Sequence, residues 1–358
     1  MAGSRSRNRR LAAGLALAFA VAATSPVARG AASPSAPAKP ASPAEPAESA
    51  IDATYRQLTE AAGAVVGLRV KALRNARSAS TLGTERTGSG VVIAPSGLVL
   101  TIGYLILEAD QVEVTDASGR TVPAMVAAYD HATGFGLLRP VVPLGPKPLR
   151  LGASRNLEAG EKVLVATPGE TGLSIATVVS RRPFAGYWEY LIDGAVFTAP
   201  PRFDHGGAAL INKDGELVGI GSLLVMDALK PGERFPGNMF VPVELLEPIL
   251  DEMIATGRQK AGRRPWLGVN AVEDDGRLRV VRVTDESPAD EAGLKPGDII
   301  LGLEGRAVRD LEAFYKALWA TGGPGVDVTL RVLQGGDVRE IRVKSMDRLD
   351  FVRRKPTI

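Results

Sequence analysis

Short β-branched segments, each soon followed by Gly, Pro, Asp or Asn, fill the chain from Gly63 to about residue 199. Few stretches between them have the spacing of an amphipathic helix. Short strands at this regular spacing are typical of antiparallel sheets that form either a closed barrel or a sandwich. The pattern alone does not distinguish the two. The predicted strands are Val65–Val70, Ser89–Ile93, Leu98–Thr101, Gln111–Val114, Val122–Val126, Lys162–Ala166, Leu173–Val179 and Glu189–Ile192.

The N-terminus has the three parts of a secretory signal peptide. Residues 1–10 are basic, Leu11–Thr24 is apolar, and the small-residue run Ala28-Arg29-Gly30 follows. The apolar part is shorter than the roughly 20 residues that span a bilayer, so cleavage is favoured over a retained membrane anchor. We therefore predict a signal peptide over residues 1–30, no stable membrane span after cleavage, and an exported protein, periplasmic or secreted.

A Pro/Ala-rich stretch over residues 31–50 is predicted to be a disordered linker. Ile51–Ala62 has helical spacing and is predicted as a short helix before the first strand. Residues 347–358 are predicted to form a tail.

Charge and composition exclude several classes of function. Removal of residues 1–30 takes away five arginines and leaves 38 basic against 40 acidic groups, so charge gives no case for nucleic-acid binding. The absence of cysteine rules out disulfides and thiolate catalysis. Since His131 and His205 are the only histidines, no site that needs three imidazoles can form. No cofactor is predicted.

A second domain is predicted over residues 262–346. Its strongest motif is Ser-Pro-Ala-x-x-Ala-Gly-Leu-x-x-Gly-Asp-x-Ile over residues 287–300, in which Gly293 and Gly297 suit a helix end and a turn. An amphipathic helix over Leu311–Thr321 and a strand over Val326–Val332 follow.

In the first domain, the run from Phe203 to Asn212 places a tight glycine turn before a short apolar strand. Lys213-Asp214-Gly215 is a hairpin signal, and Leu217–Ile220 gives the next strand.

These motifs resemble the HtrA/Deg family of trypsin-like serine proteases. The loop around residues 203–212 is similar to the family's nucleophile loop, Thr87–Thr101 to its opening strands, and the 287–300 motif to its circularly permuted PDZ domain. The resemblance spans about residues 60–345. It implies a mainly β chain, with a trypsin-like double antiparallel β-barrel over residues 51–257 and a C-terminal PDZ domain of α+β type. The barrels are expected at about 60–145 and 146–245, with a closing helix at 244–256, where Asn238–Val243 is similar to the preceding strand and turn.

The resemblance also implies where a catalytic triad would lie, and none of its three roles is filled. Tyr104 stands at the place of the histidine, Gly134 at that of the aspartate and Gly206 at that of the serine. A register one residue earlier would put the serine's place on His205. Asp204 would oppose a developing oxyanion. Because loss of one triad member costs about 10⁴–10⁶ in turnover, the sequence predicts no catalytic residue and no enzyme activity.

The predicted function is that of an exported pseudoprotease, which binds C-terminal or unfolded segments as a scaffold, adaptor or holding chaperone. The alternative is a serine endopeptidase of the HtrA/Deg type in protein quality control, with displaced catalytic residues. A homotrimer and active HtrA-type relatives as partners are further expectations from the resemblance.

PDZ domains bind a partner's C-terminus as an added strand, with its carboxylate held by the backbone N–H groups of a small loop. In this chain the resemblance gives that role to the loop of Trp266, Leu267, Gly268 and Val269. The other wall of the groove would be the helix, through Leu311, Tyr315 and Leu318, although periodicity does not separate these from Phe314. The alternative is a PDZ domain docked on its own barrel domain with the groove closed.

A metal site is a further alternative. Asp204-His205 and Asp130-His131 both belong to loops that the resemblance places around the same cleft. Adjacent Asp-His dipeptides lack a recognised ligand spacing, so no metal site is predicted.

Overall fold

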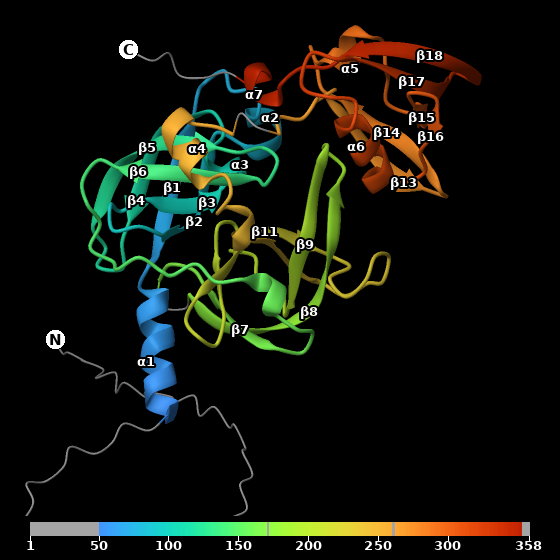
Figure 1. Cartoon of the computed structure of the whole chain (residues 1–358). Coiled ribbons are helices and arrows are strands. Elements are labelled where there is room, and N and C mark those ends of the chain that lie inside the picture. Colours follow the sequence, from blue (N-terminus) through green and yellow to red (C-terminus); the bar gives the residue numbers. More distant parts are fainter. Residues whose placement is uncertain (1–49, 170–171, 260–261, 353–358) are drawn as a thin grey trace, which may run out of the picture. The chain divides into compact units, whose positions relative to one another are not determined.

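The computed structural model describes residues 50–169, 172–259 and 262–352 (Figure 1). The predicted signal peptide, nearly all of the predicted linker and residues 353–358 of the predicted tail lie outside the described residues. Helix α1 (Ala50–Ala62) precedes the first strand, as predicted. Within the described ranges, no helix is long and apolar enough to cross a membrane.

Six antiparallel strands form the first barrel: β1 (Val65–Ala72), β2 (Glu85–Val92), β3 (Val99–Ile102), β4 (Ala109–Thr115), β5 (Thr121–Tyr129) and β6 (Phe135–Pro140). Their order is β1-β2-β3-β6-β5-β4, and pairing of β4 with β1 closes the sheet. In β1, Leu68 and Val70 are buried while Arg69 and Lys71 are exposed, which is the alternation that a barrel strand requires. Two short helices, α2 (Ala79–Leu82) and α3 (Gly103–Ile106), connect the strands.

The second barrel is built in the same way from β7 (Lys162–Ala166), β8 (Leu173–Gly186), β9 (Tyr190–Ala199), β10 (Ala209–Ile211), β11 (Leu217–Val225) and β12 (Gly237–Pro242). The order is β10-β11-β12-β9-β8-β7, and β7 pairs with β10 to close it. The predicted Asp-Gly hairpin lies between β10 and β11, where the amide of Gly215 donates to the carbonyl oxygen of Asn212. The strand pattern left open whether the sheets form a barrel or a sandwich. The structure shows two closed barrels.

The helix predicted at residues 244–256 is shorter than expected. The structure has a 3-10 turn, η2 (Val243–Leu245), and then a separate helix, α4 (Leu250–Thr256). Pro248 lies between them. A proline lacks the backbone N–H that a continuous helix needs and disfavours helical geometry at the residue before it, so the helix begins after Pro248.

The C-terminal domain has one sheet: β13 (Val269–Asp274), β14 (Arg277–Val283), β15 (Ile299–Leu303), β16 (Arg306–Ala307), β17 (Asp327–Gln334) and β18 (Asp337–Lys344). The order is β13-β14-β15-β17-β18, which leaves β13 at an edge, and β16 pairs with β15. Three helices complete the domain: α5 (Pro288–Glu291), α6 (Leu311–Trp319) and α7 (Arg348–Phe351). Helix α6 ends two residues before the predicted Thr321, and Gly322, Gly323 and Pro324 follow it. The predicted fold class is confirmed.

The hairpin of β8 and β9 is longer than the sequence predicts. Strand β8 continues past the predicted end at Val179 to Gly186, which pairs with Tyr190. Its register shifts between Arg182 and Phe184, where Pro183 interrupts the ladder. Figure 1 shows this hairpin extending from the second barrel toward α6. The extension brings residues 186–191 against the C-terminal domain.

Candidate functional site

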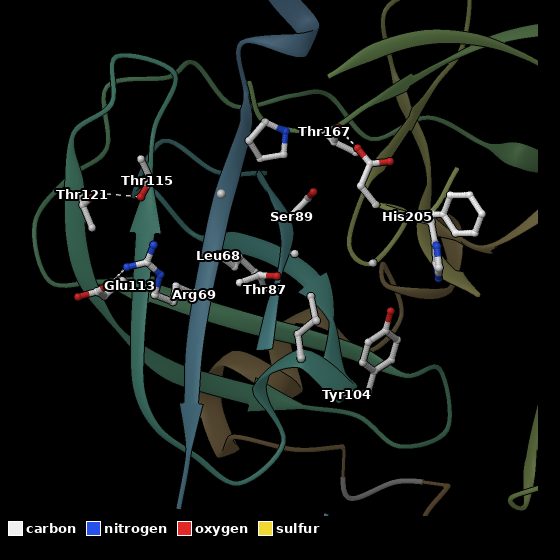
Figure 2. Close-up of a pocket in the computed structure, with 17 residues that line it drawn as sticks. Leu68, Arg69, Thr87, Ser89, Tyr104, Glu113, Thr115, Thr121, Thr167 and His205 are labelled. Atoms are coloured by element: carbon white, nitrogen blue, oxygen red, sulfur yellow. Dashed lines mark hydrogen bonds and ion pairs between the residues drawn. The ribbon is translucent and has the colours of Figure 1, made fainter. Parts of the chain in front are cut away.

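A cleft of about 740 Å³ lies between the first barrel and the 203–206 loop of the second (Figure 2). Strands β1 and β2 line one side, with Thr87 and Ser89, and Thr167 and Pro168 line the other. The cleft therefore occupies the place where the resemblance puts a protease active site.

The 203–207 loop is fixed against β2 by backbone contact. The amide of Ser89 donates to the carbonyl oxygen of Gly206 at 2.8 Å, and the Thr101 hydroxyl donates to the carbonyl oxygen of Ser89 at 2.7 Å. A Cβ atom on Gly207 would collide with that same Ser89 carbonyl oxygen. Only glycine permits so close an approach of the two backbones, which accounts for the glycine turn seen in the sequence.

Tyr104 and Gly206 face each other across the cleft. A Cβ atom on Gly206 would lie 2.8 Å from the Tyr104 hydroxyl, which donates to the carbonyl oxygen of Ser222 at 3.0 Å. Figure 2 shows the hydroxyl pointing toward the loop of His205, whose Nδ1 contacts the Arg202 carbonyl oxygen at 3.0 Å. This geometry favours Gly206 over His205 as the position that faces residue 104. Burial raises the pKa of the Tyr104 phenol, which makes it a hydrogen-bond donor and a poor base near neutral pH.

The space beside Gly134 is filled by Tyr190, to which no sequence motif assigns a functional role. Tyr190 of β9 donates its hydroxyl to the carbonyl oxygen of Thr133 at 2.7 Å, and a Cβ atom on Gly134 would lie 2.9 Å from that hydroxyl. Gly134 has φ +79°, and the amide of Gly103 donates to its carbonyl oxygen at 2.6 Å. A carboxylate side chain at position 134 would need the room that the Tyr190 phenol takes.

The Asp204 carboxylate is paired with Arg202, which is close in sequence, and with Thr167, which follows β7. It accepts hydrogen bonds from Arg202 Nε and from the Thr167 hydroxyl, each at 2.8 Å. The hydrogen bond from Arg202, followed by that from Thr167, lowers the pKa of Asp204. The expected opposition to an oxyanion is therefore reduced, because the Arg202 guanidinium offsets the negative charge.

The two Asp-His pairs make separate contacts. Asp130 accepts from the amide and the hydroxyl of Thr133 at 2.8 and 2.7 Å, and Arg348 Nη1 lies 2.9 Å from His131 Nε2. Burial first, and then Arg348 and Arg264, keep the pKa of His131 well below its usual value. Across the described parts of the chain, no group of three His, Cys, Asp or Glu side chains could hold a metal ion. The geometry gives the metal alternative no support.

The predicted peptide loop of the C-terminal domain holds a carboxylate that comes from the same chain. Glu189, at the tip of the β8–β9 hairpin, is 3% exposed. Its Oε1 accepts from the amides of Gly268 and Val269 at 2.7 and 2.8 Å, and its Oε2 accepts from the amide of Leu267 at 3.0 Å. The fourth predicted loop residue, Trp266, is buried and contacts the ring of Phe351 instead.

The hairpin tip also contacts both walls of the predicted groove. The Tyr315 hydroxyl of α6 donates to the carbonyl oxygen of Gly186 at 2.7 Å and accepts from the amide of Glu189 at 3.1 Å. On edge strand β13, the amide of Ala271 donates to the carbonyl oxygen of Tyr187 at 3.0 Å. Among the helix residues predicted to line the groove, Tyr315 is thus the one whose side chain hydrogen-bonds to the hairpin tip.

Apolar contacts continue the same interface. The other helix candidates, Leu311, Phe314 and Leu318, are buried in the core of the C-terminal domain, and Leu191 of β9 joins that core at 5% exposed. These contacts match the alternative in which the groove is closed by the chain's own barrel domain.

Two domain families match the sequence. A trypsin-like peptidase domain matches residues 88–220, and a PDZ domain matches residues 265–345. A probable periplasmic serine endoprotease, DegP-like, from Hahella chejuensis is 26% identical over 279 residues, which cover 73% of this chain and 57% of that protein. The serine protease PepD of Mycobacterium tuberculosis is 27% identical over 267 residues, 68% of this chain and 57% of that protein. The chain thus spans little more than half the length of these curated relatives.

A solved structure of the HtrA-type protease AlgW with a decapeptide has the same fold. Its TM-score is 0.51 at 21% sequence identity, and the match covers 85% of this chain and 99% of that one. At this identity the likeness concerns the fold alone.

The comparisons contradict one prediction from the sequence, that the chain is not an enzyme. That prediction is wrong: the matched relatives are named serine endoproteases or serine proteases. The assignment of triad positions to Tyr104, Gly134 and Gly206 stays a prediction.

A double-mutant cycle tests whether position 206 faces residue 104. Gly206→Ala is expected to cost about 1–3 kcal/mol of unfolding free energy, because the new methyl group meets the Tyr104 hydroxyl. In a Tyr104→Phe background the cost should fall by about 1 kcal/mol. Denaturant unfolding of the wild type, the two single variants and the double variant measures the coupling. Strictly additive costs would show that a side chain at position 206 does not contact the Tyr104 hydroxyl.

A second prediction concerns pH. Burial outweighs the three amide donors and raises the pKa of Glu189 from 4.5 to about 7. A carboxyl group whose pKa is raised on folding contributes stability that is lost as pH rises from the unfolded to the folded value. The side chain of the Glu189→Gln variant does not titrate. Relative to that variant, the free energy of unfolding of the wild-type chain should fall by on the order of 3 kcal/mol between pH 4.5 and 7. Denaturant unfolding of both proteins at pH 5 and pH 8 checks this, and a constant difference would refute it.

Proposed function

Because the chain belongs to the HtrA/Deg family, in which a trypsin-like domain is followed by a PDZ domain, we propose that it is an exported polypeptide-binding protein of protein quality control. It captures free C-termini in the PDZ domain and holds extended segments in the cleft of the barrel domain. Export is supported by the predicted signal peptide and by the periplasmic names of relatives. A homotrimer and active HtrA-type partners stay predictions.

The observation that carries this proposal is the convergence of consecutive amides on one carboxylate. The N–H groups of Leu267, Gly268 and Val269 all donate to the two oxygens of Glu189. A free C-terminus offers the same group at the end of an extended chain, and edge strand β13 beside the loop can pair with that chain. The loop thus has the donors that recognition of a C-terminus requires.

The cleft offers a second surface for an extended segment. Phe203 is 86% exposed beside it, where an apolar side chain of a bound polypeptide can pack. The hydroxyls of Thr87 and Thr115 lie among the lining residues and can hydrogen-bond a peptide backbone. An unfolded protein presents both features, exposed apolar side chains and unpaired backbone.

Fluorescence anisotropy of labelled decapeptides on the full chain tests C-terminal capture. Each peptide is prepared with a free and with an amidated C-terminus. The free form should bind at least about tenfold more tightly, because hydrogen bonds to a charged carboxylate contribute about 1.5–3 kcal/mol. Equal affinity of the two forms across the peptide library would refute the proposal.

Serine endopeptidase activity is the second candidate, and the names of the relatives favour it. In this chain the reaction would need a nucleophile and an orienting acid other than residues 104, 134 and 206, because a phenol and two glycines supply neither. Ser89 is a serine that lines the cleft, although its side chain is buried.

Incubation with unfolded casein and with a fluorophosphonate probe tests this candidate. The expected results are casein fragments and one labelled hydroxyl, located by mass spectrometry of the digested protein. A sample pretreated with the probe should lose the cleavage, which controls for a contaminating metalloprotease. Absence of both labelling and fragments would eliminate the endopeptidase candidate and leave the binding proposal untouched.

A further inference from the structure

We propose that Glu189 is a built-in ligand of the PDZ domain, which an incoming C-terminus must displace together with the tip of the β8–β9 hairpin. This inference rests on the proposed capture of C-termini and adds its regulation. The carboxylate site of the loop is not vacant in the resting chain, because a side chain of the barrel domain holds it.

The loop owes its shape to the PDZ domain itself. Gly268 has φ +89°, and a Cβ atom there would collide with the side chain of Ser287. The carbonyl oxygens of Leu267 and Gly268 accept from the amides of Ala289 and Thr284 at 2.8 and 2.9 Å. These contacts hold the loop from behind, so its N–H groups point outward whether or not Glu189 is present.

The site has room for one carboxylate at a time. Glu189 Oε1 accepts from all three amides, the Leu267 contact being the longest at 3.3 Å, and Oε2 accepts from Leu267 again. With the Glu189 side chain buried, no face of these donors is left for a second anion. Binding of an external C-terminus and of Glu189 are therefore mutually exclusive.

The backbone of the hairpin tip also occupies the place of an added strand. The Ala271 amide of β13 donates to the carbonyl oxygen of Tyr187. The Tyr315 hydroxyl hydrogen-bonds to both Gly186 and Glu189. An extended ligand pairs with the same edge of β13. The tip thus competes for both the carboxylate site and the strand site of the groove.

The closed arrangement carries a cost that favours release. Glu189 is a non-glycine residue with φ +58°, a left-handed conformation that side chains disfavour. Its carboxylate also leaves water on closing. The left-handed φ belongs to the turn between the paired residues Gly186 and Tyr190, whereas the desolvation cost is relieved when the tip withdraws.

Peptide affinity of the full chain tests the competition. Glu189→Ala should raise the affinity for peptides with a free C-terminus by about tenfold or more, since it removes the internal competitor. Glu244→Ala is the matched control: the Glu244 carboxylate also accepts two backbone amides, those of Ser154 and Arg155, away from the PDZ domain. It should leave the affinity unchanged. Tyr315→Phe, which keeps the ring and removes the bridge, should give a smaller gain.

Hydrogen exchange separates this inference from the proposed function. In Glu189→Ala, without peptide, the amides of Leu267, Gly268, Val269 and Ala271 should exchange faster than in wild type, and in Glu244→Ala they should not. Unchanged exchange in Glu189→Ala would overturn the inference, as would measurable but equal peptide affinity of that variant and wild type. If no protein binds a free C-terminus but exchange still rises, the proposed function fails and the internal contact stands.

Discussion

The backbone contact between β2 and the 203–207 loop is the constraint on which the rest of the barrel domain depends. The hydrogen bond from Ser89 to Gly206 joins one barrel to the other, and Gly207 has no space for a side chain. This contact sets how far apart the barrels stand. It therefore also determines the width of the cleft and which side chains reach into it.

Two phenols fill the space beside two glycines of the cleft and its neighbourhood. Tyr104 fills the space facing Gly206, and Tyr190 fills the space facing Gly134. Each phenol donates to a backbone carbonyl oxygen, of Ser222 and of Thr133, so neither hydroxyl is left buried without a partner. Aromatic area gained in this way stabilises the interface between the barrels and binds the β8–β9 hairpin to the first barrel.

Much of the fold could be predicted from the sequence, because strand patterns and turn signals are local. The motifs also follow one another along the chain in the order that is typical of one family. The Gly-Gly turn before β10 and the motif around α5 are examples. The hairpin extension could not, since Pro183 and two arginines break the alternation of β8. Glu189 and Tyr190 were missed for another reason: their partners lie far along the chain, and neither residue belongs to a motif. The prediction of no enzyme activity was wrong because it rested on three positions and ignored what relatives do.

A ligand carried on the same chain is present at a high effective concentration, on the order of millimolar for short connections, that dilution does not change. Glu189 lies at the tip of a strand pair that belongs to the second barrel, so it stays near the loop when it is released. In the proposed competition, the apparent affinity for an external C-terminus is therefore lower than the intrinsic affinity of the loop, by the fraction of chains in which the loop is free. The length and anchoring of one hairpin thus set how tightly a ligand must bind before it can enter the groove.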